Sequence, residues 1–276
     1  MTKTPHQCQE SVINMESRIY QKYKDEGIQS IRHESEFWVH ERLGRYIPYY
    51  PTLLRNKLKI KREIFGDKFT DSDPLKIIWI DPDEITRSVI GGPRMFGRVE
   101  SGNWDQDSSR FLDSCRASSI YDHFMNNVSW KETKYFQKEV SLLEERGIAR
   151  YGCKSVDEIL SRLQGVDELY IKIRSNGYQT QRELLRTNPK TTLEKNKDAP
   201  HPLCNEIGVN LTRDGDFVFS RCGIHRLVIA KVLELDEVPV QVRVRHSKWQ
   251  QVRNRHQARE KACFDYSHPD LYDLKR

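Results

Sequence analysis

The chain has 276 residues, of which 37% are hydrophobic and 31% charged, a composition typical of a water-soluble globular protein. No apolar run reaches the roughly 18 residues of a transmembrane helix, and the opening residues, MTKTPHQCQE, lack the apolar core of a secretion signal. The formal net charge of +6 is a mild excess that permits binding of nucleotides or nucleic acids without requiring it.

Cysteine placement indicates the chemical environment of the chain. No Cys-x-x-Cys pair occurs, so the sequence gives little support for a zinc site. Because no secretion signal is visible, we expect reduced thiols in a cytoplasmic protein. No helix-turn-helix, zinc-finger or RNA-binding signature stands out. The six cysteines are Cys8, Cys115, Cys153, Cys204, Cys222 and Cys263.

Composition and periodicity predict three parts. Residues 1–74 are expected to form a helical extension, residues 75–246 the core domain, and residues 247–276 a basic helix with a tail. A helical insertion is expected inside the core at about residues 108–165. The segment Asp71-Ser72-Asp73-Pro74 marks the first boundary, because it combines turn-forming residues with a proline.

The two end parts carry helical and basic patterns. Helical periods occur at residues 11–23 and 33–46, and the run LRNKLKIKREIF at residues 54–65 is basic and amphipathic. A further basic run covers residues 253–259. We interpret both basic runs as solvated helix faces rather than as nucleic-acid or membrane surfaces, and we expect Trp249 to pack against the core.

Hydrophobic periodicity predicts an α+β core. Ser129 and Glu132 match a capping box at the start of a helix, and Gly177 fits a helix C-cap. Residues 186–200 are polar and are predicted to be a loop. The predicted elements are a strand at 76–80, helical segments at 108–147, 155–163 and 166–175, strands at 207–211 and 217–219, a helix at 227–235, and a strand at 238–244.

Residues 91–105 are rich in glycine and arginine and form a first candidate site. Arg94 and Arg98 could reach a phosphate or a carboxylate, and Trp104 could stack on a ring. Asp105 could hold a metal ion or act as a base. The alternative is a structured loop around a core tryptophan.

The junction after the strand at 217–219 carries the strongest chemical signal. Gly223 allows the backbone to approach a ligand closely, and the helix that follows begins with unpaired N–H groups and a partial positive charge. His225 and Arg226 add donors there, so the pattern predicts an anion site, most often for phosphate. The alternative is a simple turn with a solvated arginine. The candidate residues are Arg221, Cys222, Gly223, Ile224, His225 and Arg226.

The stretch from Glu206 to His246 resembles the ParB/sulfiredoxin superfamily. ParB-like proteins carry Gly-x-x-Arg at this place, and Gly223-Ile224-His225-Arg226 fits, together with the later Val238-Pro239-Val240. Sulfiredoxins carry a reactive cysteine between the glycine and the histidine. This chain departs from that pattern, with Ile224 at that point and Cys222 before the glycine.

The segment around Gln181 resembles a second part of the same family. In ParB-like domains a helix, a glycine and a glutamine-rich segment precede the core strand, as Gly177 and Gln181 do here. Gln181 and Arg182 are therefore candidate ligand contacts, and a capped helix end is the alternative.

The resemblance implies an α+β fold of the ParB/sulfiredoxin type that binds a nucleotide phosphate. Its members include CTP hydrolases, a free-serine kinase and sulfiredoxins, so we expect phosphoryl transfer or NTP hydrolysis with CTP, ATP or ADP, and Mg²⁺ as a further candidate cofactor. Asp81, Glu84 or Asp105 could serve as base or metal ligand. Two alternatives stay open: a non-catalytic module that binds a nucleotide or nucleic acid, and a thiol enzyme that uses Cys222.

Overall fold

The computed structural model describes Gly44, Ile47 and residues 49–89, 92–196, 198–258 and 267–274. The chain divides into two compact units, residues 1–50 and residues 51–276, and the elements described below lie in the second unit. The helices expected at residues 11–23 and 33–46 lie outside the described residues.

The amphipathic helix expected at residues 54–65 is present as helix α3, Tyr50–Phe65. Its apolar side chains Leu54 and Leu58 are 6% and 7% exposed. Leu58 lies so close to Gly97 that a Cβ there would come within 2.8 Å of its Cδ1. From Pro51 onward this helix therefore belongs to the same compact unit as the sheet, whereas the sequence pattern placed a boundary near residue 74.

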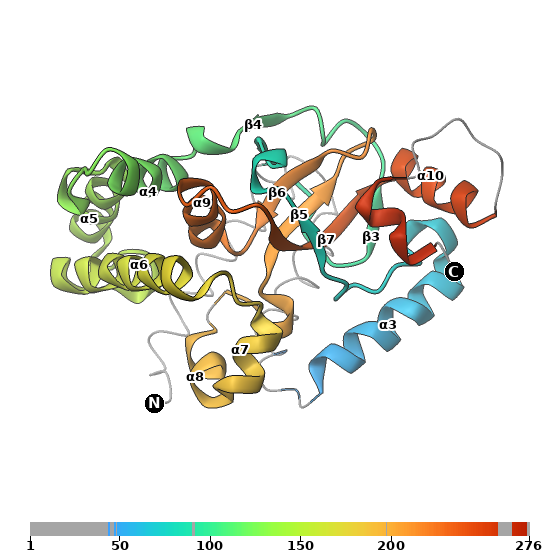
Figure 1. Ribbon diagram of the computed structural model, residues 1–276, viewed down its shortest axis with the longest axis horizontal. Helices are drawn as coiled ribbons and strands as arrows, with labels where there is room; N and C mark the ends of the chain where they lie inside the picture. Colours follow the sequence, from blue (N-terminus) through green and yellow to red (C-terminus); the bar gives the residue numbers. More distant parts are fainter. Residues whose placement is uncertain are drawn as a thin grey trace. The chain divides into compact units, whose positions relative to one another are not determined.

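One mixed sheet of seven strands forms the centre of the described part of the chain (Figure 1). Its order is β1-β7-β5-β6-β2-β4, and β3 pairs with the end of β7. The central pair β5–β7 is parallel, and β5–β6 is an antiparallel hairpin. The strands are β1 Ile78–Ile80, β2 Arg87–Val89, β3 Arg98–Glu100, β4 Ser108–Arg110, β5 Ile207–Leu211, β6 Phe217–Arg221 and β7 Val238–His246.

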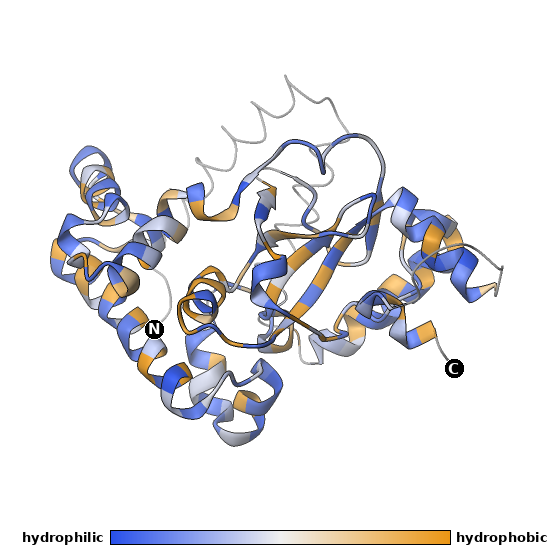
Figure 2. Ribbon diagram, turned by 45° about the horizontal axis from the view of Figure 1, so that its top comes forward, coloured by the Kyte–Doolittle hydropathy of each residue, from blue (hydrophilic) through white to orange (hydrophobic). Residues whose placement is uncertain are grey.

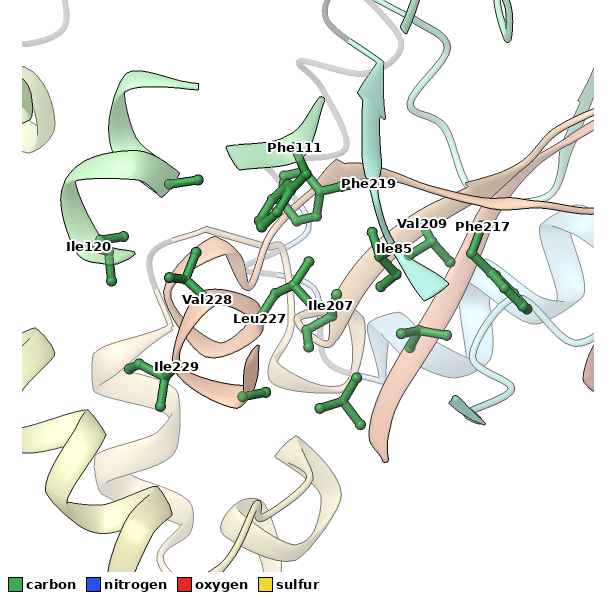
Figure 3. Packing of buried hydrophobic residues seen from close by; sticks show 14 of the residues in the cluster. Ile85, Phe111, Ile120, Ile207, Val209, Phe217, Phe219, Leu227, Val228 and Ile229 are labelled. Carbon is green, nitrogen blue, oxygen red and sulfur yellow. The ribbon is translucent and has the colours of Figure 1, made fainter. Parts of the chain in front are cut away.

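Both faces of the central strands are covered. All nine residues of β7 are buried, with Val240 and Val242 in the apolar cluster and Gln241 and Arg243 next to them in sequence. Helix α9, Ile224–Val232, contributes Leu227, Val228 and Ile229 to the same cluster as the strand residues Ile207 and Val209 (Figure 3). Figure 2 shows apolar residues along α9 and the central strands.

A helical layer lies beyond α9. Helices α4, α5 and α6 pack together, and α4 and α6 contact α9, which lies between them and the sheet (Figure 1). The expected helical segment at 108–147 begins later than predicted, because residues 108–110 form strand β4 against β2. The two predicted segments at 155–175 are one continuous helix. The bounds are α4 Cys115–Met125, α5 Lys134–Arg146 and α6 Val156–Asn176.

Local signals in the sequence set most helix ends here. The capping box of Ser129 and Glu132 is present, although it opens a short 3-10 turn, Trp130–Glu132, ahead of α5. Gly177 ends α6 with a φ of 73°. The loop predicted at 186–200 is wrong in its first half, because α8, Pro189–Lys195, follows α7, Gln181–Thr187. Proline at the first position of a helix is favourable, since its missing N–H is not needed there.

The C-terminal basic helix is α10, Ser247–Gln257, and Trp249 packs against the core as expected. Arg253 departs from the predicted solvated face, because its side chain is 0% exposed and pairs with Asp71 at 2.8 Å. It also contacts Asp270 and Asp273 of the 3-10 helix Pro269–Leu274. The fold class is α+β, as predicted, and no described helix is long and apolar enough to cross a membrane.

Candidate anion-binding site at the start of helix α9

A left-handed turn connects strand β6 to helix α9. Cys222 and Gly223 have φ values of 58° and 67°, and Ile224 is the first helical residue. A Cβ on Gly223 would lie 2.9 Å from Cγ1 of Ile207. Glycine is therefore required here both by the backbone conformation and by the close approach of β5. The helix starts three residues earlier than predicted, so residues 224–226 form its first turn.

No side chain of the first turn of α9 pairs with the free N–H groups or the positive dipole end at its N-terminus. It has no side-chain cap and no acidic residue in its first turn. By contrast, hydroxyl side chains cap α4, α5, α6 and α7, namely Ser114, Thr133, Ser155 and Thr180. The unpaired N–H groups and the positive end of the helix dipole at α9 thus remain available to an anion.

The side chain of Arg226 is committed to an ion pair inside the protein. Its guanidinium lies 3.1 Å from Oε2 of Glu206, whose side chain is 1% exposed, and it also donates to the hydroxyl of Tyr178 and the carbonyl of Asn205. The other oxygen of Glu206 accepts the backbone N–H of Gln181 at 2.5 Å. Burial raises the pKa of Glu206, and the charge of Arg226 only partly offsets this.

Gln181 and Arg226, both predicted as site residues, are joined by Glu206, which the sequence did not indicate. Gln181 and Arg226 both bind Glu206, which lies immediately before strand β5. This contact joins the start of α7 to the first turn of α9. It is a structural contact in which the arginine has a carboxylate partner of its own.

The side chain of His225 points elsewhere, into a pocket between α9 and the helical layer. The pocket has a cavity volume of about 30 Å³, enough for about two water molecules. Its other lining residues come from α5, from α6 and from the segment between them. They are Tyr135, Glu139, Arg150, Tyr151, Cys153, Ile159, Arg162, Leu163 and Val166.

The surroundings of His225 are electropositive. Burial, followed by the charges of Arg116, Arg162 and Arg226, lowers its pKa to about 3, so the imidazole is neutral at pH 7. Neither ring nitrogen forms a hydrogen bond with a described residue. A neutral imidazole has one N–H donor and one acceptor, so His225 can donate to a ligand without carrying a charge itself.

Two tyrosines arrange the arginines around this pocket. Arg116 donates to the hydroxyl of Tyr135 at 3.0 Å and to that of Tyr151 at 2.9 Å. Arg162 stacks on the ring of Tyr151 at 3.8 Å from its centroid, and no carboxylate within the described ranges pairs with it. Burial raises the pKa of Tyr135 to about 12, so the phenol stays neutral. Arg162 lines the pocket as an exposed residue, and its guanidinium stacks on Tyr151 rather than on a carboxylate of the described residues.

Sequence reasoning missed Arg116, Tyr135, Tyr151 and Arg162. They lie on four different elements, namely α4, α5, the 3-10 turn Arg150–Gly152 and α6, and none belongs to a short motif. One local feature of Tyr151 is unusual, a φ of 60° for a residue other than glycine, which orients its ring beneath Arg162. Only packing of the helical layer on α9 brings these side chains to His225.

The predicted carboxylates lie away from the start of α9. Asp81 caps the 3-10 turn Pro82–Glu84, and Glu84 is the last residue of that turn. Lys231 contacts the turn by donating to the Pro82 carbonyl and to Asp83. Lys231 is six residues after His225 on α9, a rise of about 9 Å along the axis. These two carboxylates therefore lie toward the opposite end of the helix.

Asp105 also has a partner of its own. It accepts from Arg213 at 2.7 and 2.9 Å, and this side-chain hydrogen bonding, opposed by burial, lowers its pKa to about 2. Arg213 lies at the tip of the β5–β6 hairpin, and the five residues of β6 separate that tip from Gly223 by roughly 15 Å. Asp105 is therefore at the far end of the hairpin.

The remaining predicted residues are also dispersed. Arg98 on β3 pairs with Glu100 at 2.7 Å and lies beside the ring of Phe69, and Arg94 lies in the loop ahead of that strand. The Cys222 sulfur contacts the Arg243 guanidinium at 3.3 Å and the Asp198 carbonyl at 3.4 Å. Arg221 ends β6, and Ile224 packs against the apolar cluster.

The donor set fits an anion better than a metal ion. No group of three or more His, Cys, Asp or Glu side chains that could hold a metal comes together within the described ranges. Arginines, a neutral histidine and free helix N–H groups are donors, which suit phosphate oxygens. Comparison with protein-family models, with curated proteins and with solved structures finds no match to this chain.

Proposed function

We propose that this protein binds a phosphate group of a nucleotide or a related phosphorylated small molecule at the start of α9. The observation that carries the proposal is the combination of an uncapped helix N-terminus with a pocket at which Arg162 has no carboxylate partner. The resemblance of the Gly223–Arg226 segment to ParB-like proteins supports a nucleotide as the ligand that carries the phosphate, with CTP, ATP and ADP as candidates.

Each group at this place has a defined part in such binding. The first-turn N–H groups of α9 and the guanidinium of Arg162 supply hydrogen-bond donors and positive charge to the phosphate oxygens. His225 supplies a neutral N–H donor. Arg226 acts indirectly, because its pair with Glu206 fixes the first turn of α9 to strand β5 and helix α7.

Binding without catalysis is favoured over phosphoryl transfer or NTP hydrolysis. Phosphoryl transfer requires a base or a positioned nucleophile and usually Mg²⁺, and Asp81, Glu84 and Asp105 lie toward other ends of the domain. The enzymatic alternative would need Glu139, the carboxylate that lines the pocket. For either activity we propose a cytoplasmic location, where nucleotides are abundant.

Thermal unfolding in the presence of CTP, ATP, ADP, GTP or inorganic phosphate, with and without Mg²⁺, tests the proposal. A ligand that binds only the folded protein raises the melting temperature by mass action. We expect a rise with at least one of these ligands. The rise should shrink in Arg162→Gln and persist in Arg174→Gln, which removes the same charge from a position on the same helix that does not line the pocket. No rise with any ligand, or an equal rise in Arg162→Gln, would refute the proposal.

A further inference from the structure

Helix α3 exposes several large apolar side chains. They make up four of the thirteen large hydrophobic side chains that are exposed in the described part of the chain, although α3 has only 16 residues. Single exposed apolar residues are common on protein surfaces, but a concentration of them on one element marks a surface that binds a partner. The four are Leu53, Ile60, Ile64 and Phe65, which are 50%, 54%, 66% and 51% exposed.

Three of these side chains form one stripe along the helix. With 3.6 residues per turn, Ile60 and Ile64 each lie within about 20° of Leu53 around the helix axis. The buried side chains of Leu54 and Leu58 are turned away from the stripe by about 100° to 140°. The stripe is therefore separate from the face that packs on the domain, and α3 lies along the outside of the sheet with one side open (Figure 1).

The charges of α3 are predominantly positive. The helix has five basic residues and one acidic residue, Glu63. Arg55 pairs with Asp73 at 2.9 Å, and Arg62 pairs with Asp67 at 2.6 Å. The other three basic residues are lysines, which lie between these two arginines in the sequence.

The lysines lie on both sides of the apolar stripe. Lys57 and Lys61 are turned from Leu53 by about 40° and 80° in one direction, and Lys59 lies on the other side of the stripe together with Glu63. A lysine can lay its methylene groups along an apolar surface while its ammonium group stays in water. An exposed apolar stripe bordered by lysines is typical of a helix face that enters the interface of an anionic bilayer.

Shape and charge distinguish between the possible partners of this stripe. A symmetric contact with a second copy of the chain would bring two positively charged helices together, which like-charge repulsion disfavours. A nucleic acid would match the lysines but would leave the apolar side chains without an apolar partner. A bilayer interface accepts protruding apolar side chains without a shape-matched groove and also supplies negative charge.

We propose that α3 binds peripherally to the surface of an anionic membrane. Leu53, Ile60 and Ile64 enter the boundary between headgroups and acyl chains, and the lysines lie among the lipid phosphates. The helix remains attached to the domain through its buried leucines. The sequence pattern alone predicted a solvated face here, and the exposed stripe is the observation that changes this interpretation. The surface is separate from the start of α9, so the inference does not depend on the proposed phosphate binding.

The experiment is co-sedimentation of the full chain with lipid vesicles. One set of vesicles contains phosphatidylcholine alone, and the other contains equal parts of phosphatidylcholine and phosphatidylglycerol. We expect binding to the second set only, and weaker binding as the salt concentration approaches 1 M, where the Debye length is about 3 Å. Ile60→Gln should weaken binding about tenfold, because an isoleucine is no longer buried. Lys59→Gln should weaken it about fivefold, the effect of one lysine at an anionic surface.

Helix α6 provides matched controls. Ile171→Gln and Lys172→Gln remove the same side chains from exposed positions on that helix, and both variants should bind the vesicles as the wild type does. Arg162→Gln should also bind as the wild type, because it changes the proposed phosphate site and not α3. Loss of vesicle binding in Arg162→Gln would show that lipid headgroups bind near α9, and this would overturn the role of α3.

Other results would also overturn the proposal. They are failure of the wild-type chain to bind anionic vesicles, equal binding to both sets of vesicles, and equal binding by Ile60→Gln and Ile171→Gln. A concentration-dependent dimer that Ile60→Gln abolishes, without vesicle binding, would assign the stripe to a second copy of the chain instead. The substituted side chains are exposed, so each variant should keep the wild-type melting temperature, and Ile64→Gln provides a second test of the same stripe.

Discussion

Replacement of Arg226 by methionine separates its structural contact from a direct role at the ligand. The guanidinium pairs with Glu206 in a place where the two side chains are 11% and 1% exposed. Methionine keeps much of the length and the apolar stem of arginine but leaves Glu206 with the single N–H of Gln181. Removal of one partner of a buried ion pair costs about 3–5 kcal/mol, because the other charge stays buried without compensation.

The assay is urea unfolding followed by circular dichroism at pH 8 and pH 5. Burial already raises the pKa of Glu206, and loss of Arg226 removes a charge that lowers it, so the variant's folded state takes up a proton there more readily than the unfolded chain does. Stability of the variant relative to wild type should therefore recover as the pH falls. The deficit of about 3–5 kcal/mol should be larger at pH 8 than at pH 5.

A matched control is Arg182→Met, which removes an exposed arginine one residue after Gln181. Its stability should stay within about 0.5 kcal/mol of wild type. The reasoning is refuted if Arg226→Met loses less than about 1 kcal/mol or if its deficit does not change with pH. Unchanged stability together with lost phosphate binding would show that the guanidinium serves the ligand directly.

Two further predictions concern titration. The imidazole of His225 should show no change in its proton NMR shifts between pH 8 and pH 5, because burial and nearby guanidinium groups lower its pKa to about 3. Since this folded-state pKa lies below the ordinary 6.5, the contribution of His225 to stability is lost as the pH falls from 6.5 toward 3. A titration midpoint near 6.5 would contradict the assigned environment. For Asp71, burial raises the pKa but hydrogen bonds from Arg253 and Gln250 and the charge of Arg253 lower it to about 2 from 3.8, so stability on the order of 2 kcal/mol is present above pH 4 and lost toward pH 2. Asp71→Asn should thus destabilise the protein at pH 7 and about half as much at pH 3 in urea unfolding. An equal loss at both values would contradict the ion pair.

The sequence by itself determined the elements whose signals are local. Alternation of Ile207, Val209 and Leu211 and the Asp-Gly turn after them predicted the β5–β6 hairpin, and the structure confirms it. The glycine at 177 marked the end of α6. The requirement for glycine at 223 was also visible, because a strand followed by glycine and an apolar helix leaves few other turns. Such signals lie within a few residues of the element that they define.

Only the tertiary structure decided which charged side chains are partners. The sequence left Arg226 open to phosphate, but Glu206, 20 residues earlier, binds it inside the protein. The basic pattern predicted that Arg253 lies on a solvated helix face, but its side chain is buried against Asp71, which is 182 residues away in the chain. Charge pairing depends on distances between side chains after packing, and no periodicity encodes that distance.

At the pocket beside His225, too, the sequence determined the local element and the tertiary structure determined its surroundings. The sequence placed His225 at a helix start, where unpaired N–H groups favour an anion. Its surroundings come from α4, α5, α6 and the segment before α6, and Arg116, Glu139 and Arg162 carry no mutual spacing that would have joined them. Local periodicity and capping could fix where α9 begins, but only the docking of the helical layer on α9 could determine which charges surround that beginning.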